Sequence, residues 1–277
     1  MPVIDAHQHF WKYNAEEFDW INDDMKIIRE DFLPADLKPL LTENNIDGCI
    51  AVQTKQTEEE NNFLLQLVKE NDFIKGIVGW IDLMSDDIED RLNFWSYQKK
   101  IKGFRHILQD EENRSLMLEP AFKNGVSLLN KFQFAYDILI YPDQLQFAFE
   151  LVKIFSEQKF VIDHIAKPYI KSGEIEQWKK DIEKFKPCEN VYCKISGMVT
   201  EAEWNNHSLQ TFKPYLDVVV ETFGTKKIMY GSDWPVCLVA AASYNEVYKI
   251  AEQYFSAFSK DDQEDVFENN PMRFYNL

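Results

Sequence analysis

Eight short stretches rich in β-branched and aromatic residues recur along the chain, and their spacing is the feature that most limits how it can fold. They cover residues 2–9, 48–53, 75–80, 102–107, 134–140, 160–165, 191–196 and 227–233. Their starts lie on average about 32 residues apart, which is the length of one β-strand–α-helix–β-strand unit. Eight such units in a row are typical of an α/β protein with a (β/α)8 barrel.

The segments between these stretches carry helical patterns. Residues 57–71 show an apolar stripe at helical spacing, and Thr57 with Glu60 matches a capping box at the start of a helix. Residues 143–158 and 214–224 show similar patterns, the latter ending at a glycine. The alternation of strand and helix therefore runs through the whole chain.

A doubly wound open sheet is the alternative fold, but no glycine-rich phosphate-binding loop follows the first predicted strand. We therefore expect one (β/α)8 TIM-barrel domain over residues 1–277. An acidic and aromatic insertion at about residues 12–36 follows the first strand. In a barrel this insertion would lie over the active-site face.

The charge balance limits the partners of the chain. It has 47 acidic and 30 basic residues, for a formal charge of −17. Phosphate groups would be repelled, so we expect no nucleic-acid partner and no anionic membrane surface. The sequence also shows no apolar run long enough to span a bilayer and no secretion signal. We expect a cytoplasmic protein whose four cysteines are reduced thiols.

Polar residues gather at the C-terminal ends of the predicted strands, where a (β/α)8 barrel carries its active site. They are His7, His9, Gln53, Asp82, Arg105, His106, His164, Lys194, Ser196 and Asp233. Such an arrangement on seven of the eight strands is not expected by chance. It predicts a functional site at the mouth of the barrel.

Strand alternation predicts which side chains point into this site. His7 and His9 are two residues apart and share one face, and Asp5 on the same face is expected to bond an imidazole. Lys194 and Ser196 are expected to point inward.

The two neighbouring strands are less clear. Gln53 is predicted to face inward, with Ile50 and Val52 facing out. Arg105 and His106 are neighbours, so only one of them is expected to face the interior, and alternation does not decide which.

The chain resembles the amidohydrolase superfamily, in its amidohydrolase 2 branch, and most closely the L-fuconolactonase-like and L-rhamnonolactonase-like sugar lactone hydrolases. The resemblance covers essentially the whole chain and rests on His7-x-His9, DHIAKP at 163–168 and GSDWPVC at 231–237. HIAKP departs slightly from HLGKP or HIGKP, which are more usual in this group. We expect the extra methyl group to leave the chemistry unchanged.

The resemblance implies that His7, His9, His164 and Asp233 form the catalytic centre and hold a divalent metal where relatives bind one. Three imidazoles and a carboxylate suit one Zn²⁺ or Mn²⁺. No suitably placed lysine is visible for a binuclear centre, and no organic cofactor is expected. Two alternatives stay open, since the imidazoles can polarise a carbonyl directly or through the metal.

The expected substrate is a small sugar-derived lactone, which the enzyme would hydrolyse to the aldonic acid. Asp233 is expected to activate water as a general base. The side chains expected to contact the substrate are Lys194, Arg105 or His106, Gln53, Trp11 and Trp234. For the two tryptophans, packing at the rim is as good an interpretation as stacking on a sugar ring.

Two other functions compete with the lactonase hypothesis. A metal-dependent decarboxylase of the same superfamily would be expected to carry a further histidine on the strand after His164, where this chain has Lys194 and Ser196. A non-catalytic carbohydrate-binding barrel would be expected to lack one of the four central groups, and all four are present.

Overall fold

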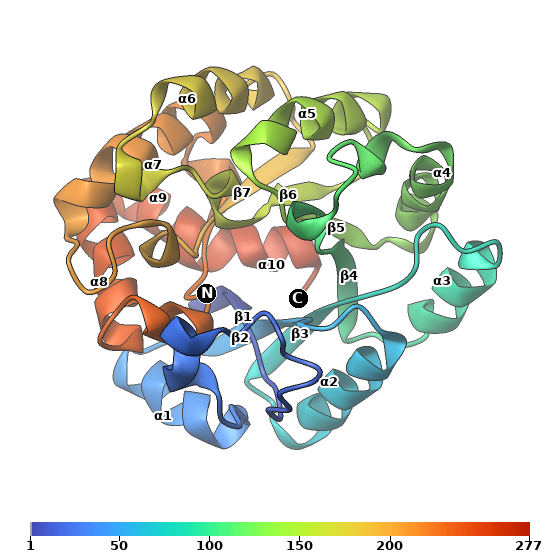
Figure 1. Cartoon of the computed structure of the whole chain (residues 1–277), viewed down its shortest axis with the longest axis horizontal. Coiled ribbons are helices and arrows are strands. Elements are labelled where there is room, and N and C mark those ends of the chain that lie inside the picture. The colour runs from blue at the N-terminus through green and yellow to red at the C-terminus, as the bar shows by residue number, and fades with distance from the viewer. Residues whose placement is uncertain (1) are drawn as a thin grey trace.

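The computed structural model describes residues 2–277, and its eight parallel strands form one sheet in chain order, ringed by helices (Figure 1). The strands are β1 (Ile4–Gln8), β2 (Gly48–Val52), β3 (Ile74–Gly79), β4 (Ile101–His106), β5 (Ala135–Ile138), β6 (Phe160–Ile162), β7 (Val191–Ile195) and β8 (Ile228–Tyr230). Just beyond β8, the Asp233 amide donates to the His7 carbonyl at 2.8 Å, and the His9 amide donates to the Trp234 carbonyl at 2.7 Å. These bonds join the last strand to the first, and the predicted (β/α)8 barrel is confirmed.

One helix follows each strand and covers the outside of the barrel. These helices are α1 (Pro34–Glu43), α2 (Glu58–Glu70), α3 (Ile88–Ser96), α4 (Pro120–Leu129), α5 (Leu145–Ile154), α6 (Glu176–Ile182), α7 (Leu209–Phe223) and α8 (Tyr244–Phe255). Two short helices, α9 (Lys260–Glu264) and α10 (Asn270–Tyr275), end the chain. Among residues 2–277, no helix is long and apolar enough to cross a membrane.

The predicted capping box of α2 is not formed. The Thr57 side chain makes no capping bond, and the Glu60 carboxylate instead accepts from the amide and the hydroxyl of Thr54 at 2.9 and 2.8 Å. Glu60 therefore fixes the loop after β2 rather than the first turn of the helix. The helix predicted to begin at residue 214 begins at Leu209, because Pro214 is accommodated within its first two turns.

Two apolar layers hold the barrel together. The outer layer lies between strands and helices, and the inner one fills the barrel below the mouth. The inner layer comprises Ile4, Ala6, Ile50, Val52, Val78, Ala135, Val161 and Met229, closed by Phe274 and Tyr275 of α10. Figure 1 shows α10 lying across the ring of strands. The prediction that Ile50 and Val52 face out was wrong, because Gln53 lies beyond the end of β2 and alternation cannot be counted back from it.

The prediction that Asp5 bonds an imidazole was also wrong. Its carboxylate accepts from the amides of His7 and Ser232, at 3.1 and 2.9 Å, and from the Tyr244 hydroxyl at 2.9 Å. The register between β1 and β2 shifts between Asp5 and Gln8. Such an irregularity breaks the simple alternation of faces, so Asp5 points toward α8 while His7 points into the barrel.

The connection between β1 and α1 spans residues 9–33 and includes most of the segment at about residues 12–36 that we predict to be an insertion. Trp11 and Phe32 exchange backbone hydrogen bonds of 3.0 and 2.9 Å and so close the base of this loop. The loop carries Trp20 and Met25 over the mouth of the barrel, where both line its pocket. Met25 belongs to a short 3-10 helix, Asp23–Ile28.

Candidate active site

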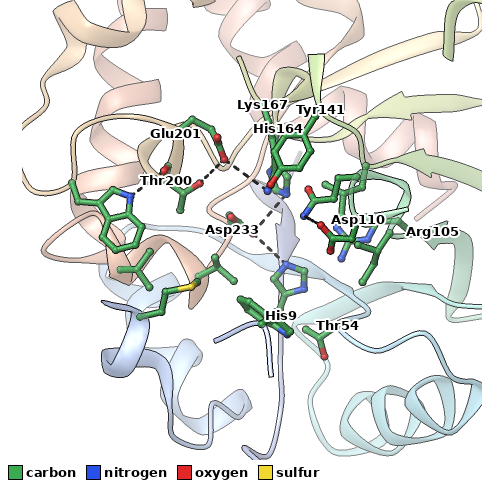
Figure 2. A pocket seen from close by; sticks show the side chains of 18 residues that line it. His9, Thr54, Arg105, Asp110, Tyr141, His164, Lys167, Thr200, Glu201 and Asp233 are labelled. Carbon is green, nitrogen blue, oxygen red and sulfur yellow. Dashed lines mark hydrogen bonds and ion pairs between the residues drawn. The ribbon is translucent and has the colours of Figure 1, made fainter. Parts of the chain in front are cut away.

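A pocket of about 460 Å³ opens at the C-terminal ends of the strands (Figure 2). Its lining comes from loops after nearly every strand, including His9 after β1, Thr54 after β2, Tyr141 after β5 and Asp233 after β8. This is the face on which a (β/α)8 barrel carries its catalytic groups. Of the ten polar residues at the strand ends, His9, Arg105, His164 and Asp233 line this pocket, as predicted, and the other six do not.

Asp233 is the centre of the polar cluster at the base of this pocket. Its Oδ1 lies 3.2 Å from Nε2 of His9, 3.8 Å from Nε2 of His7 and 3.9 Å from Nε2 of His164. All four side chains are buried, with 6% or less of each side chain exposed. One carboxylate oxygen thus faces three imidazole nitrogens in a site nearly closed to solvent.

The opposite ring nitrogens are held by the surrounding protein. Nδ1 of His9 donates to the Val52 carbonyl at 2.8 Å, and Nδ1 of His164 lies 2.8 Å from the Ser196 hydroxyl. Nδ1 of His7 lies 3.3 Å from the carboxylate of Asp163. Partners of this kind fix the ring orientation and direct each Nε2 toward Asp233.

Burial and neighbouring charge set the ionisation of the cluster. Burial lowers the pKa of His7 and of His164 well below the usual imidazole value. Burial alone would raise the pKa of Asp233, but His164 and His9 outweigh it and hold that pKa below its usual value. At neutral pH the carboxylate is therefore ionised, and the rings of His7 and His164 are neutral.

The donor set fits one divalent metal. The ligand atoms of His7, His164 and Asp233 all lie within 4.8 Å of one another, and His9 directs its Nε2 to the same carboxylate oxygen. Ligand bonds of roughly 2.0–2.1 Å in a tetrahedral zinc site place neighbouring ligand atoms about 3.4 Å apart, close to the spacing around Asp233. Neutral imidazoles and an ionised carboxylate are also the protonation states that metal binding requires.

His164 sits in an unusual stretch of backbone. The four residues from His164 to Lys167 all have positive φ, between 47° and 59°. Non-glycine residues, and a β-branched one such as Ile165 above all, pay for this left-handed conformation with strain that usually persists only at functional sites. The turn directs both His164 and Lys167 into the pocket.

Gly197 is the residue that makes room for the His164 ring. A Cβ placed on Gly197, which has φ +58°, would lie 2.5 Å from Nδ1 and 2.7 Å from Cγ of His164. We expect Gly197→Ala to displace the ring and lower kcat/KM by about 10²-fold, the order of loss that a 1 Å misplacement can cause.

Gly173→Ala is the matched control for this substitution, because Gly173 also has positive φ but no atom within 4 Å of the added Cβ. It should lose about 1 kcal/mol of stability with kcat/KM unchanged, since only the backbone is strained. Urea unfolding and steady-state kinetics measure both effects. Equal losses of activity in the two variants would contradict the assigned contact with His164.

Lys194 lies beneath the site and not within the pocket, contrary to the expected substrate contact. Its ammonium is fully buried, where it bonds Asp137 and lies 3.0 Å from Asp163 and 3.3 Å from Nδ1 of His7. The Tyr275 hydroxyl donates to the same Asp137 at 2.8 Å. Lys194 does point into the barrel, as predicted, but it supports His7 from below.

Arg105 faces the interior and His106 faces the outside, which resolves the choice left open by the sequence. The five N–H groups of Arg105 are directed to Gln53, Asp163 and Nε2 of His7 at distances from 2.6 to 3.3 Å. Gln53 therefore holds Arg105 rather than a ligand. His106 instead bonds Glu111 at 2.7 Å and packs on Phe122 of α4.

Trp11 and Trp234 pack at the rim, so the expected stacking on a substrate is not supported. Both are buried, with Phe32 between them at ring-centroid distances of 5.5 and 5.3 Å. The tryptophans that do line the pocket are Trp20 and Trp204. Trp20 is 39% exposed and presents a ring edge to Trp11.

Several polar residues of the pocket were not predicted from the sequence. Lys167, Thr200 and Glu201 line one wall, with Tyr141 beside Lys167 (Figure 2). Lys167 stands in the quoted HIAKP segment, three residues after His164, and this proximity was the available signal. Thr200 and Glu201 lie in a 3-10 turn after β7, where strand alternation gives no information.

Comparison with known proteins identifies the family. Residues 4–277 match the family model described as amidohydrolase. The chain is 35% identical to an L-fucono-1,5-lactonase of Burkholderia multivorans, over 91% of this chain and 88% of that protein. It is 32% identical to an L-fucono-1,5-lactonase of Burkholderia ambifaria, over 99% and 95% of the two chains.

A crystal structure of an amidohydrolase from Burkholderia multivorans with bound zinc superposes on the whole chain. Its TM-score is 0.96 at 34% identity, and all of both chains are covered. The match of the family model and the two curated relatives agree with this likeness in fold. The chain belongs to the amidohydrolase family.

Proposed function

We propose that this protein is a lactonase that hydrolyses a neutral sugar-derived lactone, such as L-fucono- or L-rhamnonolactone, to the aldonic acid. The observation that carries the proposal is the buried Asp233 carboxylate, which faces three imidazole nitrogens at the base of the pocket. The similarity to two L-fucono-1,5-lactonases supports the choice of substrate class.

Asp233 is assigned the role of general base. Its ionised carboxylate takes a proton from a water molecule as that water attacks the lactone carbonyl carbon. The same proton then passes to the ring oxygen when the C–O bond of the tetrahedral intermediate breaks. Asp233 is regenerated as a carboxylate, and the new carboxylic acid loses its proton to solvent, so that the product leaves as the aldonate with one proton released.

The imidazoles are assigned the role of stabilising negative charge on the carbonyl oxygen. If the Ser196 hydroxyl donates to Nδ1 of His164, the Nε2–H of that ring is free to donate to the developing oxyanion. His9 donates through Nδ1 to Val52, so its Nε2 meets the pocket either as a ligand atom or, on a doubly protonated ring, as a second donor.

A divalent metal, when bound, would be held by His7, His9, His164 and Asp233 and would supply Lewis-acid polarisation of the carbonyl and a lower pKa of bound water. The rings of Trp20 and Trp204 are assigned to the apolar face of the sugar. We further propose that the protein acts in the cytoplasm, and that its charge of −17 keeps it away from nucleic acids and membrane surfaces.

The test is proton release from a panel of aldonolactones, measured in lightly buffered solution with and without exhaustive chelation. We expect acceleration over spontaneous opening with L-fucono- or L-rhamnonolactone. If the folded protein accelerates no lactone under either condition, or after zinc or manganese is added back, the proposed function is wrong.

Chelation separates the two roles of the imidazoles. If they act on the carbonyl directly, kcat should survive metal removal within about twofold. If they act through a metal, kcat should fall by 10²-fold or more and return on addition of Zn²⁺ or Mn²⁺, since several kcal/mol of carbonyl polarisation would be lost. The metal content of the same samples is measured, so that each kcat value can be related to the amount of metal bound.

A further inference from the structure

One wall of the pocket carries charged groups whose hydrogen-bonding capacity is still available. All five N–H groups of Arg105 are directed to protein acceptors, as described above. Lys167 and Glu201 differ, because their closest approach is an ion pair of 3.8 Å between Nζ and Oε1. Direct ammonium–carboxylate hydrogen bonds are about 2.7–2.9 Å long, so this pair is not closed.

The surroundings of the pair hold it at the edge of the cavity. The two side chains are 16% and 19% exposed, and both line the pocket beside His164 and Asp233 (Figure 2). The Lys167 ammonium lies 5.6 Å from the centre of the Tyr141 ring, and the Thr200 hydroxyl lies 3.3 Å from the Glu201 carboxylate. Among the described residues, Thr200 thus supplies one weak hydrogen bond to Glu201, and no direct hydrogen bond of the Lys167 ammonium is recorded, so both groups keep capacity to bond a ligand.

The backbone supplies a second, independent observation. Lys167 is the last of the four left-handed residues that begin at His164. This strained turn fixes the reacting imidazole and the Lys167 ammonium on one short segment. Strain of this kind persists where a functional geometry requires it.

We propose that Lys167 and Glu201 form a site that binds one ring hydroxyl of the substrate. The Glu201 carboxylate accepts a hydrogen bond from the hydroxyl group, while the Lys167 ammonium donates one to the hydroxyl oxygen. A hydroxyl group is both donor and acceptor, so it matches an open pair of opposite charge better than a carboxylate or a methyl group does. The proposal rests on the lactonase function and assigns these residues to specificity rather than to bond breaking.

The test compares substrates with and without ring hydroxyls. We expect Glu201→Gln and Lys167→Met to lower kcat/KM for L-fucono-1,5-lactone by about 10- to 100-fold, mainly through KM, because a polar site left unpaired discriminates strongly. For δ-valerolactone, which has the same ring size and no hydroxyl, the loss should stay below about threefold. The double variant should lose less than the product of the two single losses, since both act on one hydroxyl.

A neighbouring ion pair provides the matched control. Lys171 and Glu203 lie 3.0 Å apart on the loops that follow β6 and β7, but both are exposed and neither lines the pocket. Lys171→Met and Glu203→Gln should leave kcat/KM unchanged for both lactones. Equal losses on both lactones for the Lys167 and Glu201 variants, or no loss on either, would overturn the proposal.

Binding of a neutral sugar tests the hydroxyl site without requiring that the protein hydrolyse a lactone. Quenching of tryptophan fluorescence by L-fucose reports on the pocket, where Trp20 and Trp204 lie. The Kd should rise at least about fivefold in Glu201→Gln and Lys167→Met, and it should be unchanged in the Lys171 and Glu203 variants. An unchanged Kd in all four would overturn the hydroxyl site even if the lactonase function holds. A selective rise would support the site even if no lactone is opened.

Discussion

Replacing Asp233 with asparagine is expected to lower kcat/KM for lactone opening by at least about 10³-fold, a loss of about 4 kcal/mol of transition-state stabilisation. The amide keeps the shape of the side chain but cannot take a proton from water. It also removes the negative charge that faces His9 at 3.2 Å. The measurement is proton release at saturating and subsaturating lactone.

Asp143→Asn is the control for this substitution. The Asp143 carboxylate pairs with Arg114 at 2.7 Å outside the catalytic pocket, so its loss should leave kcat/KM unchanged. Urea unfolding of both variants verifies that the barrel is intact. Retention of more than a tenth of the activity in folded Asp233→Asn would exclude Asp233 as the general base.

Replacing Lys194 with methionine is expected to destabilise the fold by about 3–5 kcal/mol at pH 8, because it leaves buried carboxylates without their cation. Asp137 and Asp163 are both fully buried beside Lys194. Arg105 still pairs with Asp163, but Asp137 keeps only the Tyr275 hydroxyl. The free energy of unfolding in urea measures the loss.

The loss should shrink as the pH falls toward 5. Burial already raises the pKa of Asp137 to about 6, although Lys194 opposes the shift. Without the ammonium this pKa rises further. A group whose folded-state pKa exceeds its unfolded value destabilises the fold when ionised, and the penalty is relieved as the pH drops through the folded-state pKa.

An exposed lysine serves as the control for Lys194→Met. Lys213 pairs with Asp217 on the surface of α7, and Lys213→Met should change stability by no more than about 0.5 kcal/mol at either pH. A Lys194→Met protein as stable as the wild type at pH 8 would show that the buried carboxylates need no cation.

The strands were predictable because each leaves a local pattern in the sequence. All eight were located within a few residues, since β-branched runs and helical stripes alternate at a regular spacing. The largest errors are at the ends of β6 and β8, expected at Ile165 and Asp233 but observed at Ile162 and Tyr230. After β6, four consecutive left-handed residues begin at His164, and of their residue types only histidine is enriched in that conformation.

Side-chain direction was predictable only where alternation holds. Along β7, Lys194 and Ser196 point inward as expected, because that strand pairs in regular register. Along β1 the register shift beside Asp5 breaks the alternation, and a shift of this kind depends on how neighbouring strands pair in space. The error at Asp5 has this origin, whereas the error at Ile50 and Val52 arises because Gln53 lies beyond the end of β2.

The wall of the pocket was the least predictable part of the site. Trp11 and Trp234 stand next to catalytic segments in the sequence, yet both are buried against Phe32. Trp20 and Glu201 reach the pocket from loops, whose paths are set by packing against distant elements rather than by local pattern. The meeting of His7, His9 and His164 around Asp233 was predictable because strand ends, unlike loops, have fixed positions in a barrel.

Opening of L-fucono-1,5-lactone in ¹⁸O-labelled water tests the central claim most directly, because it follows the attacking oxygen itself. If Asp233 directs water to the carbonyl carbon, the protein should accelerate ring opening above the spontaneous rate and place one ¹⁸O in the product carboxylate. A rate equal to spontaneous opening, or label on the hydroxyl released from the ring, would contradict the account.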